Sequence, residues 1–296
     1  PGKAFGTHKG NLPHDDLIGK EDGGRAWTAM GSEYRAFRPT YIQFIMNQKR
    51  HAQIIYPKDT GAILMWGDIF PGATVVEAGI GWGALTIKLL EAVGPGGRVI
   101  SYEIREDFAE SGARTVRRYL GECDHHEVKV RDISLGIDER DVDRIVLDLP
   151  EPWRVVPHAR EALSPGGIVL SYLPSTMQVK QLCDRYAEEG GFAEPETFEV
   201  ILRPWHVKGM SVRPVQWMFS HSAFLVRPPP EPQNRDVPRT STEPGQTYPS
   251  LGSGFPDFKR YAAAFSFIPS QRANCTVVTD SWDLHTLRTS LRTRTA

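Results

Sequence analysis

Residues 75–83, Val-Val-Glu-Ala-Gly-Ile-Gly-Trp-Gly, decide the fold of this chain. A short apolar segment contains Glu77 and leads into three glycines at alternate positions. Residues 84–93, Ala-Leu-Thr-Ile-Lys-Leu-Leu-Glu-Ala-Val, then carry apolar side chains at helical spacing. Because glycine lacks a Cβ, such a stretch allows a sharp turn and a close approach of the backbone to a ligand. The segment predicts a strand, a glycine turn and a helix whose N-terminus favours a carboxylate or phosphate.

The turn alone does not identify its ligand. Gly79, Gly81 and Ala84 satisfy the pattern of a dinucleotide-binding loop, and Glu103 ends the next predicted strand, over 98–103. A carboxylate at that position can hold both ribose hydroxyls of NAD or of S-adenosylmethionine (SAM). An ordinary strand-to-helix turn without a ligand is a further alternative, because glycine often punctuates loops.

Two further predicted strands also end in a carboxylate. Asp132 follows residues 126–131, and Asp148 follows residues 143–147. The carboxyl ends of parallel strands line the ligand crevice of an open α/β sheet, so we expect these carboxylates to meet those of the first two strands. Four acidic side chains suit SAM, which is cationic and has many donors, and would repel a pyrophosphate. The pattern therefore favours SAM over NAD.

Residues 148–153, Asp-Leu-Pro-Glu-Pro-Trp, form a second motif. Pro150 and Pro152 fix φ and hold the preceding residues extended, so the loop is stiff. It presents a carboxylate beside an aromatic face, which suits a planar base. Trp153 is equally consistent with a core position at the start of the next helix. Asp148 is harder to explain that way, because a buried carboxylate needs a partner.

With these motifs the chain resembles the tRNA (adenine-N1) methyltransferase family that modifies position 58 of the T-loop. The resemblance spans residues 1–227 and rests on the order and spacing of several motifs. Besides the glycine turn, these motifs are residues 7–10, 14–19, 38–40, 55–59, 67–72, 148–153, 203–214 and 221–225.

The resemblance implies a SAM-dependent enzyme in which Asp148 and Tyr56 face the target base. Adenine N1 carries a lone pair and no proton, so its methylation needs no general base, and a carboxylate can accept from the exocyclic amine as positive charge develops. Tyr56 would stack on or hydrogen-bond the base, although a half-buried core aromatic is the alternative. The residues implied to hold SAM are Glu77, Gly79, Gly81, Trp82, Gly83, Ala84, Leu85, Glu103, Asp132 and Asp148.

Two other functions stay open. A non-catalytic RNA-binding or regulatory subunit on the same fold is favoured by Trp82, because the family usually has a small residue there. An NAD-dependent oxidoreductase would need a His or Lys that handles hydride near the crevice, and residues 148–153 offer neither.

The order of the elements predicts an α/β fold with a doubly wound, mostly parallel sheet. Strand and helix alternate from 73 to 189, with a turn at 164–167, a strand over 168–173 and a helix over 176–189. Two apolar segments, 196–203 and 215–226, follow on either side of a loop suited to a hairpin. They predict the antiparallel last strand of a SAM methyltransferase sheet.

Three regions are expected along the chain. Residues 1–40 predict a small β-rich region, truncated by about two strands relative to the family. Residues 41–227 predict the SAM-dependent methyltransferase domain, and residues 228–296, rich in Pro, Ser and Thr, predict a linker and a disordered tail.

The charge balance limits how RNA could be attracted. Lys and Arg total 35 against 36 Asp and Glu, so any attraction to tRNA must be local. Candidate cations are Lys9, Arg35, Arg38, Lys49, Arg50, Lys58, Arg203, Lys208 and Arg213, flanked by Trp27, Tyr34, Trp205 and Trp217. Each taken singly is also consistent with a solvated surface charge. The homotetramer that the resemblance suggests would pool such patches.

The cysteines indicate the cellular compartment. Cys123, Cys183 and Cys275 are far apart and form no Cys-x-x-Cys pair, which argues against structural zinc or disulfides and favours a reducing cytosol. No apolar run reaches the length of a membrane span, and the N-terminus has no signal-peptide core. We expect a cytoplasmic protein that binds neither metal nor membrane.

Overall fold

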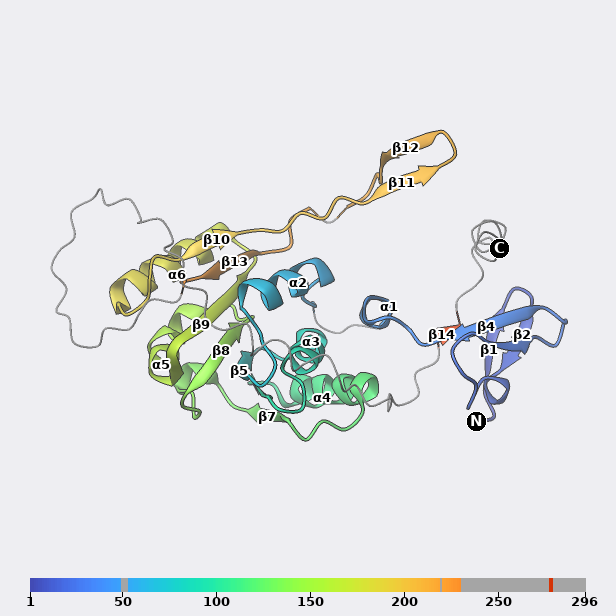
Figure 1. Cartoon of the computed structure of the whole chain (residues 1–296), viewed down its shortest axis with the longest axis horizontal. Helices are drawn as coiled ribbons and strands as arrows, with labels where there is room; N and C mark the ends of the chain where they lie inside the picture. Colours follow the sequence, from blue (N-terminus) through green and yellow to red (C-terminus); the bar gives the residue numbers. More distant parts are fainter. Residues whose placement is uncertain (49–52, 219, 230–276, 279–296) are drawn as a thin grey trace, which may run out of the picture. The chain divides into compact units, whose positions relative to one another are not determined.

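The structure, a computed structural model, describes residues 1–48, 53–218, 220–229 and 277–278 (Figure 1). These residues fall into two compact units, one with residues 1–48 and 277–278 and the other with those from 53 to 229. The predicted tail lies outside the described residues from 230 onward, except for 277–278. Within the described ranges, no helix combines the length and the apolar character that crossing a membrane requires.

The first unit consists of short antiparallel strands around a small core. Strand β1 (Ala4–Thr7) pairs with β2 (Gly10–Pro13), and β4 (Glu33–Phe37) pairs with both β3 (Gly24–Trp27) and β14 (Val277–Val278). A 3-10 turn, η1 (His14–Asp16), follows β2, and helix α1 (Tyr41–Met46) begins with a capping box of Thr40 and Gln43. The core residues are Leu12, Leu17, Ala26, Tyr34 and Ala36. Tyr34 is therefore buried, and its prediction as an RNA-facing aromatic is wrong.

The second unit is built on a seven-stranded sheet with the order β10-β13-β9-β8-β5-β6-β7. Its strands are β5 (Thr74–Ala78), β6 (Arg98–Glu103), β7 (His126–Val130), β8 (Val142–Leu147), β9 (Leu163–Leu173), β10 (Glu196–Phe198) and β13 (Phe224–Arg227). Its helices are α2 (Pro57–Trp66), α3 (Ala84–Val93), α4 (Glu106–Leu120), α5 (Val156–Ala162) and α6 (Thr176–Glu189), with 3-10 turns η2 (Ile133–Leu135) and η3 (Pro152–Arg154).

Helices cover the sheet in two groups, which confirms the predicted doubly wound α/β fold. Helix α3 packs against α2 and α4, whereas α5 packs against α6. Alternate residues of β5 and β6, such as Val76 and Ile100, join the core cluster with α5 and α6. Strand β13 runs antiparallel to both β9 and β10, so the predicted antiparallel last strand is also confirmed.

Two segments differ from the prediction. Strand β9 begins at Leu163 opposite Val142 and continues at Ile168 opposite Arg144, so the predicted turn at 164–167 is a bulge within the strand. Between β10 and β13, the chain forms a separate hairpin of β11 (Trp205–Lys208) and β12 (Ser211–Pro214), turning at Gly209 with a φ of 54°. The predicted segments 196–203 and 215–226 therefore join the sheet only through Glu196–Phe198 and Phe224–Arg227.

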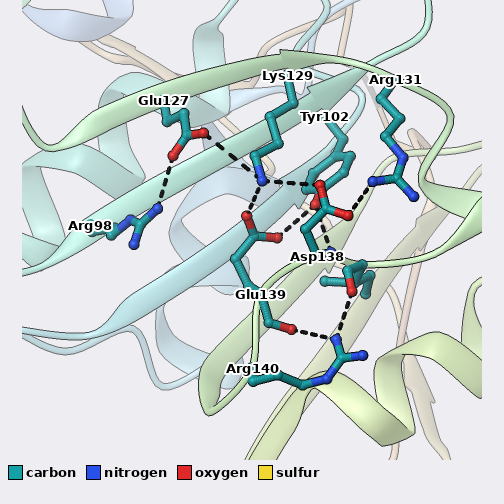
Figure 2. A network of polar contacts seen from close by, with 9 residues as sticks. Arg98, Tyr102, Glu127, Lys129, Arg131, Asp138, Glu139 and Arg140 are labelled. Carbon is teal, nitrogen blue, oxygen red and sulfur yellow. Dashed lines mark hydrogen bonds and ion pairs between the residues drawn. The ribbon is translucent and has the colours of Figure 1, made fainter.

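A polar network fixes the β7 edge of the sheet (Figure 2). The Tyr102 hydroxyl donates to Glu139 Oε2 at 2.6 Å and accepts the Asp138 N–H at 3.0 Å. Lys129 Nζ donates to Glu139 Oε1 at 2.5 Å and to Asp138 Oδ2 at 3.2 Å. Tyr102 is 1% exposed. The network therefore holds the loop before β8 against β6 and β7, the two strands that carry the predicted ribose carboxylate and Asp132.

Tyr102→Phe is expected to destabilise the protein by about 1 to 3 kcal/mol, because it leaves a backbone N–H and a carboxylate oxygen without their shared partner. Urea unfolding measures this free energy. Arg98→Ala is the control. The Arg98 side chain is 51% exposed, so its ion pair with Glu127 should contribute less than about 1 kcal/mol to the free energy of unfolding. Equal losses in both variants would contradict the role given to the Tyr102 hydroxyl.

Candidate active site

The candidate site lies where the strand order of the sheet reverses. From β5 the chain proceeds outward to β6 and β7, and it returns to the other side of β5 with β8. In open α/β sheets such a switch point forms the ligand crevice. The glycine turn follows β5 and Asp148 follows β8, so the topology brings the predicted cofactor loop next to the predicted catalytic carboxylate.

Two glycines allow close backbone contacts around the turn. A Cβ on Gly79, whose φ is +88°, would lie 2.3 Å from the Asp148 carbonyl oxygen. Gly83 precedes α3 with a φ of +75°, and its Cβ would lie 2.7 Å from the Gly112 carbonyl oxygen of α4. The Asp148 N–H also donates to the Ala78 carbonyl at 2.9 Å. Only glycine permits this packing, because any larger residue would force the two backbones apart.

Glu103 holds the turn from the neighbouring strand. Its Oε2 accepts the Gly81 N–H at 3.4 Å, and its Oε1 accepts the Arg105 N–H at 3.1 Å. The residue is 8% exposed. A carboxylate can accept about four hydrogen bonds, so acceptor positions remain for the hydroxyls of a ligand.

Glu77 lies beneath the turn and is 1% exposed. Its Oε2 accepts from the Thr86 hydroxyl of α3 at 2.8 Å and from the Ser101 hydroxyl of β6 at 2.7 Å. Burial raises the pKa of Glu77 to about 7 against the effect of these hydroxyls, and the charges of Asp148 and Glu103 add to the increase. The structure thus places Glu77 in contact with the helix and strand that support the turn.

The remaining predicted cofactor residues surround the turn in different ways. Asp132 Oδ1 accepts the Ser134 N–H at 2.9 Å, and the hydrogen bonds from Ser134 lower the pKa of Asp132. Trp82 is half-buried, with its indole nitrogen shielded from solvent. Ala84 and Leu85 are buried at the start of α3. A ligand would therefore meet these last two residues through their backbone.

A pocket of about 440 Å³ contains both residues predicted to face the target base. Asp148 lines it from the end of β8, and Tyr56 lines it from the position before α2. The other lining residues are Gln53, Ile54, Tyr172, Pro174, His221 and Ser222. The Gln53 amide donates to the Tyr56 hydroxyl at 3.2 Å. The volume of the pocket and its mixture of aromatic, apolar and acidic lining residues are typical of a small-molecule site and suit a nucleobase.

Asp148 is the buried carboxyl group of this pocket. Burial raises the pKa of Asp148 to about 7, and the nearby Glu103 charge contributes in the same direction. The Glu103 charge therefore disfavours ionisation of Asp148 in the absence of a cation. A cationic ligand between them would relieve this repulsion.

His221 forms a second polar wall of the pocket. Its Nδ1 lies 2.8 Å from Glu199 Oε2, and its Nε2 lies 3.2 Å from the Pro174 carbonyl oxygen. Both ring nitrogens thus face acceptors, which suits the doubly protonated imidazolium. The hydrogen bond to Glu199 also raises the pKa of His221.

Several pocket residues were not predicted from the sequence, and one predicted cation is buried. Tyr172 lies near the carboxyl end of β9, where the rule that located Asp148 would also have found it. Lys58 was predicted as a candidate for RNA contact, but its side chain is 6% exposed and paired with Asp59, so that prediction is wrong. Lys49 and Arg50 lie outside the described residues.

Comparison with known proteins gives matches over most of the chain. Residues 37–223 match the family described as tRNA methyltransferase complex GCD14 subunit, and residues 1–24 match the family described as TrmI-like N-terminal. The tRNA (adenine(57)-N(1)/adenine(58)-N(1))-methyltransferase TrmI of Methanocaldococcus jannaschii is 36% identical over 259 residues, which cover 78% of this chain and 90% of that protein.

Solved structures share the fold. A SAM-dependent O-methyltransferase from Thermotoga maritima matches with a TM-score of 0.71 and 34% identity, over 81% of this chain and 88% of that one. The tRNA (m1A58) methyltransferase TrmI from Aquifex aeolicus matches with a TM-score of 0.64 and 26% identity, over 77% and 89%. The resemblance stated from the sequence motifs is confirmed. The chain belongs to the GCD14/TrmI family of tRNA methyltransferases.

Proposed function

We propose that this chain is a SAM-dependent methyltransferase that transfers a methyl group to N1 of adenine at position 58 of tRNA. The observation that carries the proposal is the position of Asp148. Its backbone packs against the glycine turn at Gly79, while it also lines the 440 Å³ pocket. One residue therefore joins the cofactor loop to the pocket for the base. The named activities of the Methanocaldococcus jannaschii and Aquifex aeolicus relatives support the adenine target.

The residues at the turn fit SAM. The backbone at Gly79 and Gly83 is bare, and Glu103 keeps acceptor positions for ribose hydroxyls. Asp132 is an acceptor for the adenine amine of the cofactor. SAM supplies the electrophilic methyl group when bound. The Asp148 and Glu103 carboxylates repel each other in the absence of a ligand. The positive charge of SAM, when it is bound near them, would relieve this repulsion.

Asp148 acts electrostatically in this reaction. Methylation at N1 uses the lone pair of the base, releases no proton and leaves the base with a positive charge. The Asp148 carboxylate accepts from the exocyclic amine and is stabilising where that charge develops. Tyr56 supplies an aromatic face in the same pocket, and its hydroxyl accepts a hydrogen bond from the Gln53 amide. The chain therefore needs a charged acceptor and a stacking surface, and both line the pocket.

Transfer to a hydroxyl oxygen is the second candidate, because the Thermotoga maritima structure is named as an O-methyltransferase. An oxygen nucleophile must lose a proton, and a carboxyl with a pKa of about 7 suits a general base. Identification of the methylated nucleoside after digestion of the tRNA distinguishes transfer to adenine N1 from transfer to a hydroxyl oxygen.

The β11–β12 hairpin supports a homotetramer as the active assembly. Trp205 pairs with Pro214 and Val207 with Val212, so these side chains form one apolar face. Trp205, Val207 and Val212 are 57%, 70% and 62% exposed. The hairpin extends beyond the sheet edge (Figure 1), and a two-stranded hairpin alone is only marginally stable. A second copy of the chain would cover this face.

A tRNA substrate and cysteines without pairing motifs support a cytoplasmic location.

Glu103→Ala should weaken SAM binding by about 1.5 to 3 kcal/mol, because the charge-assisted acceptor for the ribose is lost. Calorimetric titration with SAM, and with NAD in parallel, measures the effect. Glu106→Ala removes an exposed carboxylate nearby and should bind SAM as the wild type does. Wild-type protein that saturates with NAD and gives no heat with SAM would refute the cofactor assignment.

Asp148→Ala should weaken SAM binding less than Glu103→Ala does and lower the methyl-transfer rate by about 10²- to 10³-fold, the scale of one preorganised electrostatic group. Asp148→Asn should fall nearly as far, because the amide has no negative charge. The assay is single-turnover transfer of labelled methyl to unmodified tRNA. Glu151→Ala, with an exposed side chain in the same loop, is the control. An undiminished rate in Asp148→Ala would contradict the proposal.

The pH profile tests the same carboxylate. Since the pKa of Asp148 is raised to about 7, its anion forms only as the pH rises through 7. We therefore expect kcat/KM to increase with pH across this range and to level off above it. Glu77 titrates in the same range. Asp148→Asn should abolish the increase, and an increase that persists in this variant would assign it to Glu77.

Val207→Asp should dissociate the proposed tetramer, because it puts a charge on the apolar face of the hairpin. Light scattering gives the mass of the assembly. Lys208→Ala changes the opposite face and should leave the mass unchanged. A monomeric wild type, or a tetramer that tolerates Val207→Asp, would contradict assembly through this hairpin.

A further inference from the structure

A buried charge pair lies behind the pocket. Asp59 is 0% exposed, and the side chain of Lys58 is 6% exposed. Lys58 Nζ donates to Asp59 Oδ1 at 2.7 Å, to the Val200 carbonyl at 2.6 Å and to Ser222 Oγ at 2.6 Å. Each of the three ammonium protons therefore has an acceptor. Burying such a pair is costly unless its hydrogen bonds are complete, as they are here.

Two hydroxyl groups connect this pair to the pocket. Ser222 Oγ donates to Asp59 Oδ2 at 2.6 Å, and the Tyr172 hydroxyl donates to the same oxygen at 3.5 Å. A carboxylate only accepts, and the Ser222 proton is already directed to Asp59, so Ser222 Oγ can only accept from Tyr172. The Tyr172 proton therefore points toward Asp59 and Ser222, its two hydrogen-bond partners. Burial, followed by the Asp59 charge, raises the pKa of Tyr172, so the phenol keeps its proton.

The orientation of Tyr172 decides what it offers to a ligand. Tyr172 and Ser222 both line the pocket together with Asp148. Because the Tyr172 proton is directed to Asp59, only the lone pairs of its oxygen remain for the pocket. The Asp148 carboxylate also offers only lone pairs when it is ionised. The pocket therefore presents two acceptors from the ends of neighbouring strands, β8 and β9.

We propose that Lys58, Asp59 and Ser222 are positioning residues, which orient the Tyr172 hydroxyl as an acceptor that selects, with Asp148, a base bearing an exocyclic amine. This inference rests on the proposed function and specifies how the pocket recognises its base. The amine of adenine has two N–H donors for the two acceptors. A base with a carbonyl oxygen at that position would leave both acceptors unpaired, and sites with such unpaired polar groups discriminate strongly.

The test compares adenine with purine, which lacks the amine and keeps the N1 lone pair, in two otherwise identical tRNAs. The measurement is the ratio of single-turnover methyl-transfer rates for the two substrates. In Tyr172→Phe the ratio should fall about threefold to tenfold, because one acceptor for the amine is lost, while the rate with purine changes little.

Ser222→Ala separates positioning from a purely structural role. Ser222→Ala should also lower the adenine-to-purine rate ratio. In the Tyr172→Phe/Ser222→Ala double variant the ratio should be no lower than in Tyr172→Phe alone, because both substitutions act through the Tyr172 hydroxyl. Ser220→Ala, an exposed serine on the same segment, should leave the ratio unchanged. Thermal unfolding and SAM titration of each variant establish that the fold and the cofactor site are intact.

The outcomes distinguish this inference from the proposed function. A wild-type protein that transfers no methyl to the adenine tRNA contradicts the proposed function itself. Wild-type transfer with an unchanged ratio in both single variants, or equal losses with adenine and purine, overturns only the recognition by Tyr172. A double variant whose ratio falls further than that of Tyr172→Phe overturns the positioning role of Ser222.

Discussion

The active site depends on the backbone contact between Gly79 and Asp148. A Cβ at position 79 would lie 2.3 Å from the Asp148 carbonyl oxygen, so any other residue would push the end of β5 away from the end of β8. The hydrogen bond from the Asp148 N–H to Ala78 continues the sheet to this point. The contact thereby fixes the spacing between the turn that holds the cofactor and the pocket that holds the base.

The electrostatics of the site follow from this crowding. Burial raises the pKa of Glu77 and of Asp148 to about 7, and the charge of the neighbouring Glu103 adds to both increases. A protein without a ligand therefore holds unfavourable charge at this edge of the sheet. Binding of a cation relieves it, so this repulsion favours a positively charged cofactor.

Much of the fold could be predicted from the sequence, because the regular elements carry strong local signals. The predicted ranges 84–93, 98–103 and 176–189 coincide with α3, β6 and α6. The β11–β12 hairpin forms within the predicted loop between 203 and 215. The bulge in β9 and the pairing of β14 with β4 were not predicted, since each depends on residues far apart in the chain. The same limit applies to the site: strand ends located Asp148, but the burial of Lys58 against Val200 and Ser222 depends on contacts 142 and 164 residues away.

The position of Lys58 has a mechanical consequence. Its ammonium group bonds to Val200 on the segment that enters the β11–β12 hairpin and to Ser222 on the segment that leaves it. Both arms of the hairpin are therefore clamped to the first turn of α2, directly behind the pocket. In the proposed assembly, a neighbouring subunit that displaces the hairpin would also displace the Lys58 ammonium group. That group helps to orient the Tyr172 hydroxyl. Assembly through the hairpin and selection of the base in the pocket would thus both depend on Lys58.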